Sequence, residues 1–252
     1  MDDISMPKFR EDRWIFFLLI LFFCIFFSPS VALTWNSGTH YSMVNDARFF
    51  LPKTLDSNLS KTVSFILEPD QNRIIKHTDI GACAYQIQRL AEKAIKMIQE
   101  KENIDEAFAT IGKGTHYVQD LNCPHHGIGR YDRGLHERFE SKVLQGFWEK
   151  ADFDGFQYIL DYKIFAYNAA RFSKRYINYC NSMKYDSDYF DRYKKLIDPL
   201  WDHTVNDCLD YWLTILWDGL GEEKYIELGL PSKVGTRAEK KIKFPKVKHL
   251  WD

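Results

Sequence analysis

The sequence lacks an excess of charge of either sign, a Cys-x-x-Cys pair, an internal repeat, and any strand-length run of alternating apolar and polar residues. A net charge of -1 gives the chain no global field that would recruit nucleic acid or an anionic membrane. Without a Cys-x-x-Cys pair, the usual zinc site built from paired thiolates is excluded. The missing alternation argues against a β-sheet protein. What is present is apolar, since 45% of the residues are hydrophobic and 16% aromatic, which is enough to build a substantial core.

The first part of the chain has the layout of an export signal. An uncharged apolar run extends from Trp14 to Phe27, after a basic flank that includes Arg10 and Arg13 and before the small-residue stretch VALT. This layout predicts a signal peptide over residues 1–34. An uncleaved membrane anchor is the alternative, because about 20 uncharged residues can span a bilayer. Both interpretations predict export, as a secreted or periplasmic protein or one anchored in a membrane by this segment.

The rest of the chain is predicted to be helical, because apolar residues recur at three- and four-residue steps. The expected helices are 80–102, 104–121, 135–150, 156–179 and 189–220. We therefore expect an all-α fold with a single multi-helix domain over residues 35–235. Gly112 and Gly114 lower the helix propensity of their segment but permit another helix to pack closely. Residues 236–252, which include Arg237, form a basic tail that is either a solvated terminus or a contact with anionic lipid headgroups.

The cysteines outside the export segment are even in number. They are Cys83, Cys123, Cys180 and Cys208. In an oxidising compartment they permit up to two disulfides, with three possible pairings. Because none belongs to a Cys-x-x-Cys pair, we interpret all four as structural rather than as metal ligands.

Histidines and carboxylates gather in one stretch in the middle of the chain. Two pairs share a four-residue spacing, namely His116 with Asp120 and His136 with Glu140. Residues so spaced on a helix point from the same face. The loop between the pairs contains His125 and His126, either of which is a candidate by composition. Imidazole and carboxylate are the ligands that zinc takes in the absence of thiolates, and a carboxylate such as that of Asp120 can bridge two ions. The stretch therefore predicts a metal site.

These residues resemble a known family. The motifs HYVQDLNCPHH and HERFE are similar to those of the zinc-dependent phospholipase C family, whose fold is shared with the P1/S1 nucleases. The family pattern of His-x-x-x-Asp, Pro-x-His and His-x-x-x-Glu falls on His116, Asp120, His126, His136 and Glu140. The family spacing selects His126 over His125. The resemblance therefore implies an all-α domain of the phospholipase C and P1 nuclease type.

The resemblance extends to two further segments. Members of the family begin with a tryptophan whose α-amino group and carbonyl bind zinc, and Trp35 follows the export segment, with His40 soon after. An aspartate and a histidine between the two blocks correspond to Asp70 and His77, although their spacing is shorter than in the phospholipases. Asp79 competes with Asp70 as the carboxylate.

The resemblance implies three zinc ions with nine ligand positions in all. The first ion would be held by Asp70, His77, His116 and Asp120, the second by His126, His136 and Glu140, and the third by the backbone of Trp35, His40 and the shared Asp120. It also implies a phosphodiester hydrolase that releases diacylglycerol and a phosphorylated headgroup from phospholipids by means of metal-activated water, with Asp70 as the general base. Three protein ligands at the second ion leave a position for water, which favours an enzyme.

Two alternative functions stay open. The short spacing from Trp35 to His40 is closer to that of the P1/S1 single-strand nucleases, whereas Glu140 in the last ligand position favours the phospholipase branch. A zinc-binding protein without turnover would instead close each ion with four protein ligands. The expected partner is a phospholipid or a membrane surface, with nucleic acid as the alternative substrate, and no protein partner is predicted.

Overall fold

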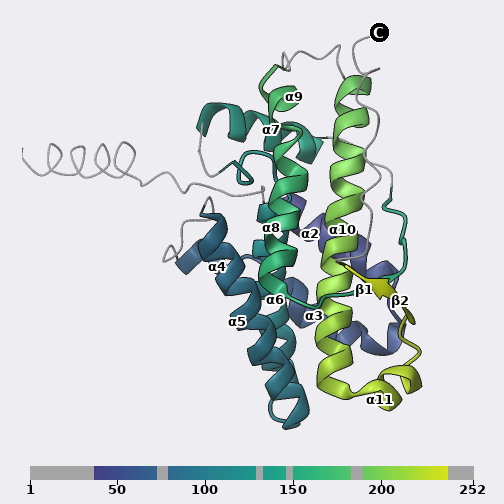
Figure 1. The fold of residues 1–252 in the computed structure, drawn as a ribbon. Coiled ribbons are helices and arrows are strands. Elements are labelled where there is room, and N and C mark those ends of the chain that lie inside the picture. The colour runs from purple at the N-terminus through teal and green to yellow at the C-terminus, as the bar shows by residue number, and fades with distance from the viewer. Residues whose placement is uncertain (1–36, 73–78, 129–132, 146–149, 183–189, 238–252) are drawn as a thin grey trace, which may run out of the picture. The chain divides into compact units, whose positions relative to one another are not determined.

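The computed structural model describes residues 37–72, 79–128, 133–145, 150–182 and 190–237. All of these lie within one compact unit that spans residues 33–252. The described elements run in the order α2 (Ser37–Phe49), η1 (Lys53–Leu55), α3 (Asp56–Phe65), α4 (Glu68–Asn72), α5 (Ile80–Gln99), α6 (Ile104–Leu121), α7 (Arg133–Gln145), β1 (Phe156–Tyr158), α8 (Tyr162–Lys174), α9 (Ile177–Ser182), α10 (Phe190–Leu220), α11 (Glu222–Glu227) and β2 (Lys233–Thr236). The all-α expectation is therefore confirmed (Figure 1).

Helix α6 lies at the centre of the packing. It packs against α3, α5, α8 and α10, and its residues from Ala107 to Leu121 are buried with the exception of Lys113. Its start is fixed by Asn103, whose side chain accepts a hydrogen bond from the backbone N–H of Glu106. A helix buried on nearly every side places polar residues of its inner turns inside the protein, and this is how α6 brings its histidine and carboxylate into the interior.

Two glycines let the neighbouring helices approach α6. A Cβ atom at Gly112 would overlap the backbone carbonyl of Thr62 on α3, and one at Gly114 would overlap the phenol of Tyr211 on α10. The tyrosine hydroxyl in turn donates a hydrogen bond of 3.2 Å to the carbonyl of Ile87 on α5. The expectation that these glycines permit close helix packing is therefore confirmed, and their low helix propensity is offset by tertiary contacts.

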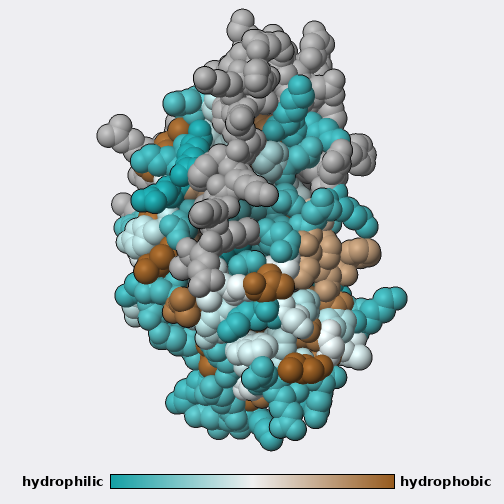
Figure 2. Space-filling view, turned by 45° about the vertical axis from the view of Figure 1, so that its right-hand side comes forward, coloured by the Kyte–Doolittle hydropathy of each residue, from teal (hydrophilic) through white to brown (hydrophobic). Residues whose placement is uncertain are grey.

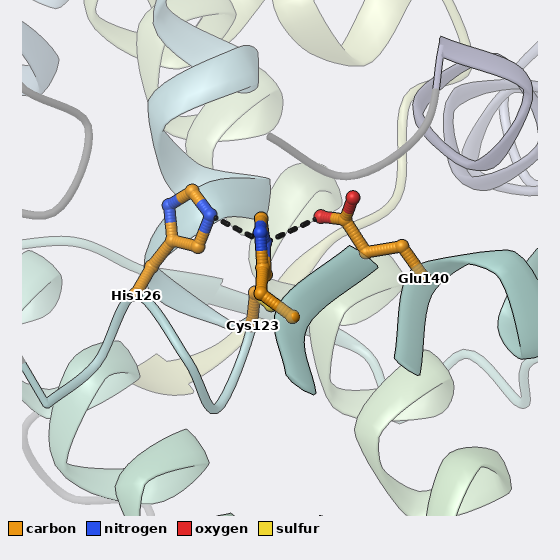
Figure 3. A group of neighbouring side chains, drawn as sticks. Cys123, His126 and Glu140 are labelled. Carbon is orange, nitrogen blue, oxygen red and sulfur yellow. Dashed lines mark hydrogen bonds and ion pairs between the residues drawn. The ribbon is translucent and has the colours of Figure 1, made fainter. Parts of the chain in front are cut away.

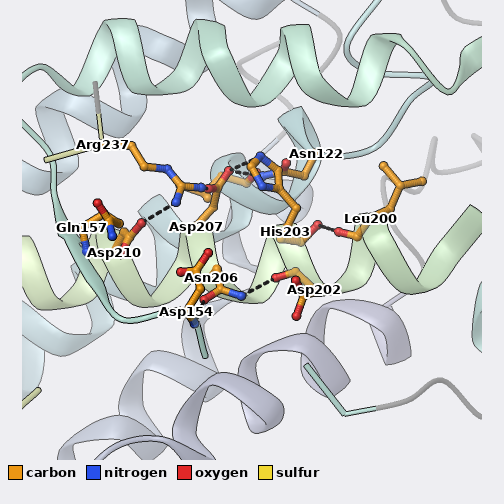
Figure 4. A network of polar contacts seen from close by, with 12 residues as sticks. Asn122, Asp154, Gln157, Leu200, Asp202, His203, Asn206, Asp207, Asp210 and Arg237 are labelled. Atoms are coloured by element: carbon orange, nitrogen blue, oxygen red, sulfur yellow. Dashed lines mark hydrogen bonds and ion pairs between the residues drawn. The ribbon is translucent and has the colours of Figure 1, made fainter. Parts of the chain in front are cut away.

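The expected helix over 156–179 was wrong in its first part. Residues 152–159 lie extended along α10, where four side chains accept hydrogen bonds from their backbone N–H groups (Figure 4). The acceptors follow one another at four-residue steps along α10 and are Asp202, Asn206, Asp210 and Thr214, at 2.8 to 3.0 Å. These bonds satisfy the backbone without a helix. Part of the segment forms β1, which pairs in parallel with β2.

Arg237, directly after β2, is buried within the domain. Its guanidinium pairs with the carboxylates of Asp207 and Asp210 of α10, at 2.7 Å from the Asp210 oxygen. Asp207 also accepts a hydrogen bond of 2.9 Å from the amide of Asn122, the residue that ends α6. This arginine is therefore held by carboxylates, which differs from both alternatives expected for the tail, a solvated terminus and a contact with lipid headgroups. The remaining tail, from residue 238, lies outside the described residues.

The surface in Figure 2 is mostly hydrophilic, with smaller hydrophobic areas scattered over its coloured part. Exposed large apolar side chains include Leu160, Ile164 and Tyr167, on or next to α8. Scattered exposure of this kind is ordinary for a protein surface. Within the described ranges, no helix combines the length and the apolar character needed to cross a bilayer. The apolar run at Trp14 to Phe27 lies outside these ranges.

We expect Gly112→Ala to lower the free energy of unfolding by about 1–3 kcal/mol, because the added methyl group collides with the backbone of α3. This loss should exceed the gain in helix propensity of about 1 kcal/mol. Urea denaturation followed by circular dichroism measures the difference. The matched control is Gly81→Ala in the first turn of α5, where a Cβ would meet only ordinary contacts at 3.4 Å or more. Equal behaviour of the two variants would contradict the close approach of α3 and α6.

Candidate metal centre

The candidate donors converge on the second half of α6 and the turn that follows it. His116 and Asp120 lie one turn apart on α6, and both are fully buried. The chain leaves the helix at Asn122, and Pro124 two residues later cannot continue it. The turn is held by backbone hydrogen bonds of 3.0 Å from the N–H groups of His126 and Gly127 to the carbonyl of Cys123. Donors on α2, α4 and α7 approach this region from other parts of the chain.

The first group of donors consists of His40 on α2, Asp70 on α4 and His116 on α6, whose ligand atoms lie within 4.8 Å of one another. Asp120 lies beside them. Its Oδ2 is 3.2 Å from Nε2 of His116, and its Oδ1 is 3.6 Å from Nε2 of His40. Oδ1 of Asp70 is 3.4 Å from the same nitrogen of His116. The two oxygens of Asp120 thus face two different histidines, which is the geometry that a bridging carboxylate needs.

Gln119 orients the ring of His40. Its side-chain oxygen is hydrogen-bonded to Nδ1 of His40, and its side-chain nitrogen donates a bond of 3.3 Å to the backbone carbonyl of His40. Both residues are fully buried. A proton held at Nδ1 leaves Nε2, on the side of Asp120, as the nitrogen with a lone pair. Outer-shell bonds of this kind commonly fix the tautomer of a metal-binding histidine.

The carboxylates dominate the electrostatics of the first group. Burial disfavours the charged form of His116, but Asp120 and Asp70 outweigh it and raise the pKa of His116 to about 10. Burial would by itself raise the pKa of Asp70, yet the hydrogen bond and charge of His116 lower it. Burial and the charge of His116 lower the pKa of His40 to about 4. The group therefore favours positive charge next to its carboxylates, and a metal ion supplies that charge without a proton.

The second group consists of Cys123, His126, His136 and Glu140, all buried, whose ligand atoms also lie within 4.8 Å of one another. Figure 3 shows His126 reaching in from the turn and Glu140 from α7. The Nε2 atoms of His126 and His136 are 3.0 Å apart, and Nε2 of His136 is 2.7 Å from Oε1 of Glu140. Burial and the neighbouring His126 and His125 lower the pKa of His136 to about 2, so this imidazole is neutral and can offer a lone pair.

Both groups fit zinc by the chemistry and the spacing of their donors. A tetrahedral zinc ion with bonds of about 2.0–2.2 Å has nitrogen and oxygen ligands about 3.3–3.6 Å apart. The donor atoms are 3.2 to 3.6 Å apart in the contacts of the first group and 2.7 to 3.0 Å apart in those of the second group. The second group is slightly tighter than a zinc ion needs. Asp120 also acts electrostatically on His136, so the two groups are neighbours.

The structure brings together seven of the nine expected positions: His40, Asp70, His116, Asp120, His126, His136 and Glu140. Trp35 and His77 lie outside the described residues. The donors expected for the first and third ions meet in one group. His125 is buried but packs its ring against His136 and Phe139, and it belongs to neither group of donors. Asp79 caps α5 by accepting a hydrogen bond from the N–H of Ala82.

The structure corrects the interpretation of the cysteines. Within the described residues, Cys83, Cys123, Cys180 and Cys208 are buried thiols and no disulfide joins any two of them. Cys123 belongs to the second group of donors, although none of the cysteines was expected to be a metal ligand. A signal for it was present, because Cys123 stands three residues before His126, and a Cys-x-x-His spacing serves zinc as well as Cys-x-x-Cys does.

The comparison with protein families gives one match. The sequence profile described as zinc dependent phospholipase C matches residues 38–201. The matched range contains every described donor of both groups, from His40 to Glu140. A comparison with curated proteins gives no match.

We expect His126→Ala and Glu140→Gln each to lower the zinc content of the purified protein by one ion per chain. Each change removes a donor from the second group, whereas the helices are held mainly by the apolar core, so the helical circular dichroism should survive. Elemental analysis after dialysis measures the zinc. The control is His125→Phe, which keeps a ring against Phe139 but offers no donor, and it should retain the ion. Full zinc in the first two variants would contradict the assignment of this group.

Proposed function

Because the chain belongs to the zinc-dependent phospholipase C family, we propose that it is a zinc-dependent hydrolase of phosphodiester bonds with phospholipids as its substrate. The observation that carries this proposal is the convergence of two groups of buried histidine and carboxylate donors at one end of α6. Burying carboxylates is costly unless cations or hydrogen bonds compensate for their charge. Bound zinc ions provide that compensation.

Three zinc ions are proposed. The second group would hold one ion, and the donors around Asp120, whose two oxygens face His40 and His116, would hold the other two. The resemblance to the family implies His77 and the α-amino group and carbonyl of Trp35 as further ligands of these two. Zinc, when bound, offsets the charge of a phosphodiester, polarises its phosphoryl oxygens and lowers the pKa of water toward neutrality.

Asp70 is the residue that we assign as general base. Its side chain is 9% exposed, whereas those of His116 and Asp120 are fully buried, so Asp70 is the most accessible to water of these three donors. Its lowered pKa keeps it a carboxylate at neutral pH, able to accept a proton. His116, 3.4 Å away, fixes the orientation of the carboxylate.

The choice of substrate rests on Glu140. The phospholipase branch has glutamate where the nucleases have aspartate, and in this chain Glu140 reaches His136 at 2.7 Å. We therefore favour phospholipids, with diacylglycerol and a phosphorylated headgroup as products. Single-stranded nucleic acid is the alternative substrate. Export by the segment of residues 1–34 would bring the enzyme to lipid outside the cytoplasm.

We expect the zinc-loaded protein that starts at Trp35 to hydrolyse phosphatidylcholine vesicles, with activity lost on chelation and restored by zinc. Release of phosphorylated headgroup measures the reaction, and single-stranded DNA is assayed in parallel. Asp70→Asn should lower the rate by about 10²–10⁴-fold, the usual contribution of a general base. Its matched control is Glu68→Gln on the same helix, which removes the charge that pairs with Lys113 at 2.9 Å and lies outside both groups of donors.

Each failure of that experiment has its own meaning. Cleavage of DNA without cleavage of lipid would replace the phospholipase by a nuclease. No turnover of either substrate by a zinc-loaded protein would favour the zinc-binding protein without catalysis. An unchanged rate in Asp70→Asn would remove Asp70 as the base.

We further expect N-terminal sequencing of the exported protein to give Trp35 as the first residue. Only cleavage between Thr34 and Trp35 creates the α-amino group, since in the uncleaved chain the same nitrogen is an amide and a very poor ligand. Thr34→Phe should block cleavage, because signal peptides need a small residue there. The precursor should then lack one zinc ion and be weakly active. A different first residue with full zinc and full activity would contradict this proposal.

A further inference from the structure

We propose that Cys123 is the fourth ligand of the second zinc ion, beside His126, His136 and Glu140. The proposal rests on the proposed function only in that the ion is zinc. It changes the character of that site, because three ligands would leave a position for water and four protein ligands complete a tetrahedron.

The position of the sulfur is the first argument. Its atom lies within 4.8 Å of a donor atom of each of the other three residues, and all four residues are buried. Cys83, Cys180 and Cys208 are equally buried but belong to neither group of donors. Burial therefore does not explain why this one thiol lies against two imidazoles and a carboxylate.

The local backbone is the second argument. Cys123 and His126 are the ends of a Cys-x-x-His segment that is closed by the hydrogen bond from the N–H of His126 to the carbonyl of Cys123. His136 and Glu140 lie one turn apart on α7. A short turn that supplies two ligands, followed by a helix that supplies two more at a spacing of four, is the arrangement of many structural zinc sites.

The surroundings of the sulfur are the third argument. The backbone N–H of His125 donates a hydrogen bond to it, as such groups do to zinc-bound thiolates. When zinc binds, the S–H bond is replaced by a sulfur–zinc bond and the proton leaves to the solvent.

A fourth protein ligand at the second ion would give the two groups of donors different roles. The second ion is then closed and structural, and it fastens the turn at Cys123 to α7. Chemistry would then fall to the first group, whose Asp70 is 9% exposed. Four protein ligands around every zinc ion would indicate a protein without turnover. Four ligands around the second ion alone are compatible with an enzyme, because the first group can still carry out the chemistry.

X-ray absorption spectroscopy of the zinc-loaded wild-type protein tests the proposal without any variant. We expect zinc–sulfur scattering at about 2.3 Å. Cobalt(II) in place of zinc should give a thiolate-to-metal charge-transfer band in the near ultraviolet. Cys123→Ser should lose both signals, and Cys208→Ser, a buried thiol outside both groups, should keep both.

Zinc bound only to nitrogen and oxygen in the wild type would overturn the proposal, as would a sulfur signal that survives in Cys123→Ser. If Cys123→Ser does not fold, the wild-type spectra decide alone. Lipid hydrolysis by a protein without zinc–sulfur bonds would refute this inference and leave the proposed function standing. A zinc–sulfur bond in a protein that hydrolyses neither lipid nor DNA would support this inference and refute the proposed function.

Discussion

The carboxylate of Asp120 lies fully buried at the end of a helix that is itself enclosed by other helices. A negative charge in such a place must be compensated, and the arrangement around it follows from that need. One oxygen faces His40 on α2 and the other faces His116 on α6. Its charge also acts on His136 and Cys123 in the neighbouring group. Helices far apart in the chain thus place their donors around one buried carboxylate. Asp120 interacts with members of both groups of donors.

A second buried charge system contacts the same end of α6 through Asn122. Asn122 donates to Asp207, and Arg237 joins Asp207 to Asp210. In the two groups of donors the compensating charge would come from zinc ions, whereas here it comes from the chain itself. The end of α6 is therefore held between two polar networks, and its position depends on both rather than on apolar packing alone.

A structural feature could be predicted from the sequence where the residues that determine it lie close together in the chain. The limits of α6 were predicted correctly because the cap at Asn103 and the break at Pro124 lie beside the helix they delimit. The candidate donors His116 with Asp120 and His136 with Glu140 stood out because their spacing is that of a helix turn, whereas His40, Asp70 and His126 came from the resemblance to a family. The extended segment at Gln157 was missed, since its conformation depends on α10 side chains some 50 residues away. Cys123 was not predicted to lie among the donors, because it does not belong to a Cys-x-x-Cys pair.

The pairing of Arg237 with α10 also bears on the order in which the chain folds. Asp207 and Asp210 emerge during synthesis or export well before the arginine that joins them. Until then, α10 carries two acids destined for the interior without this guanidinium, and docking it fully would bury charge at a high cost. Helix α10 therefore gains the full compensation of these two acids only once Arg237 is in place.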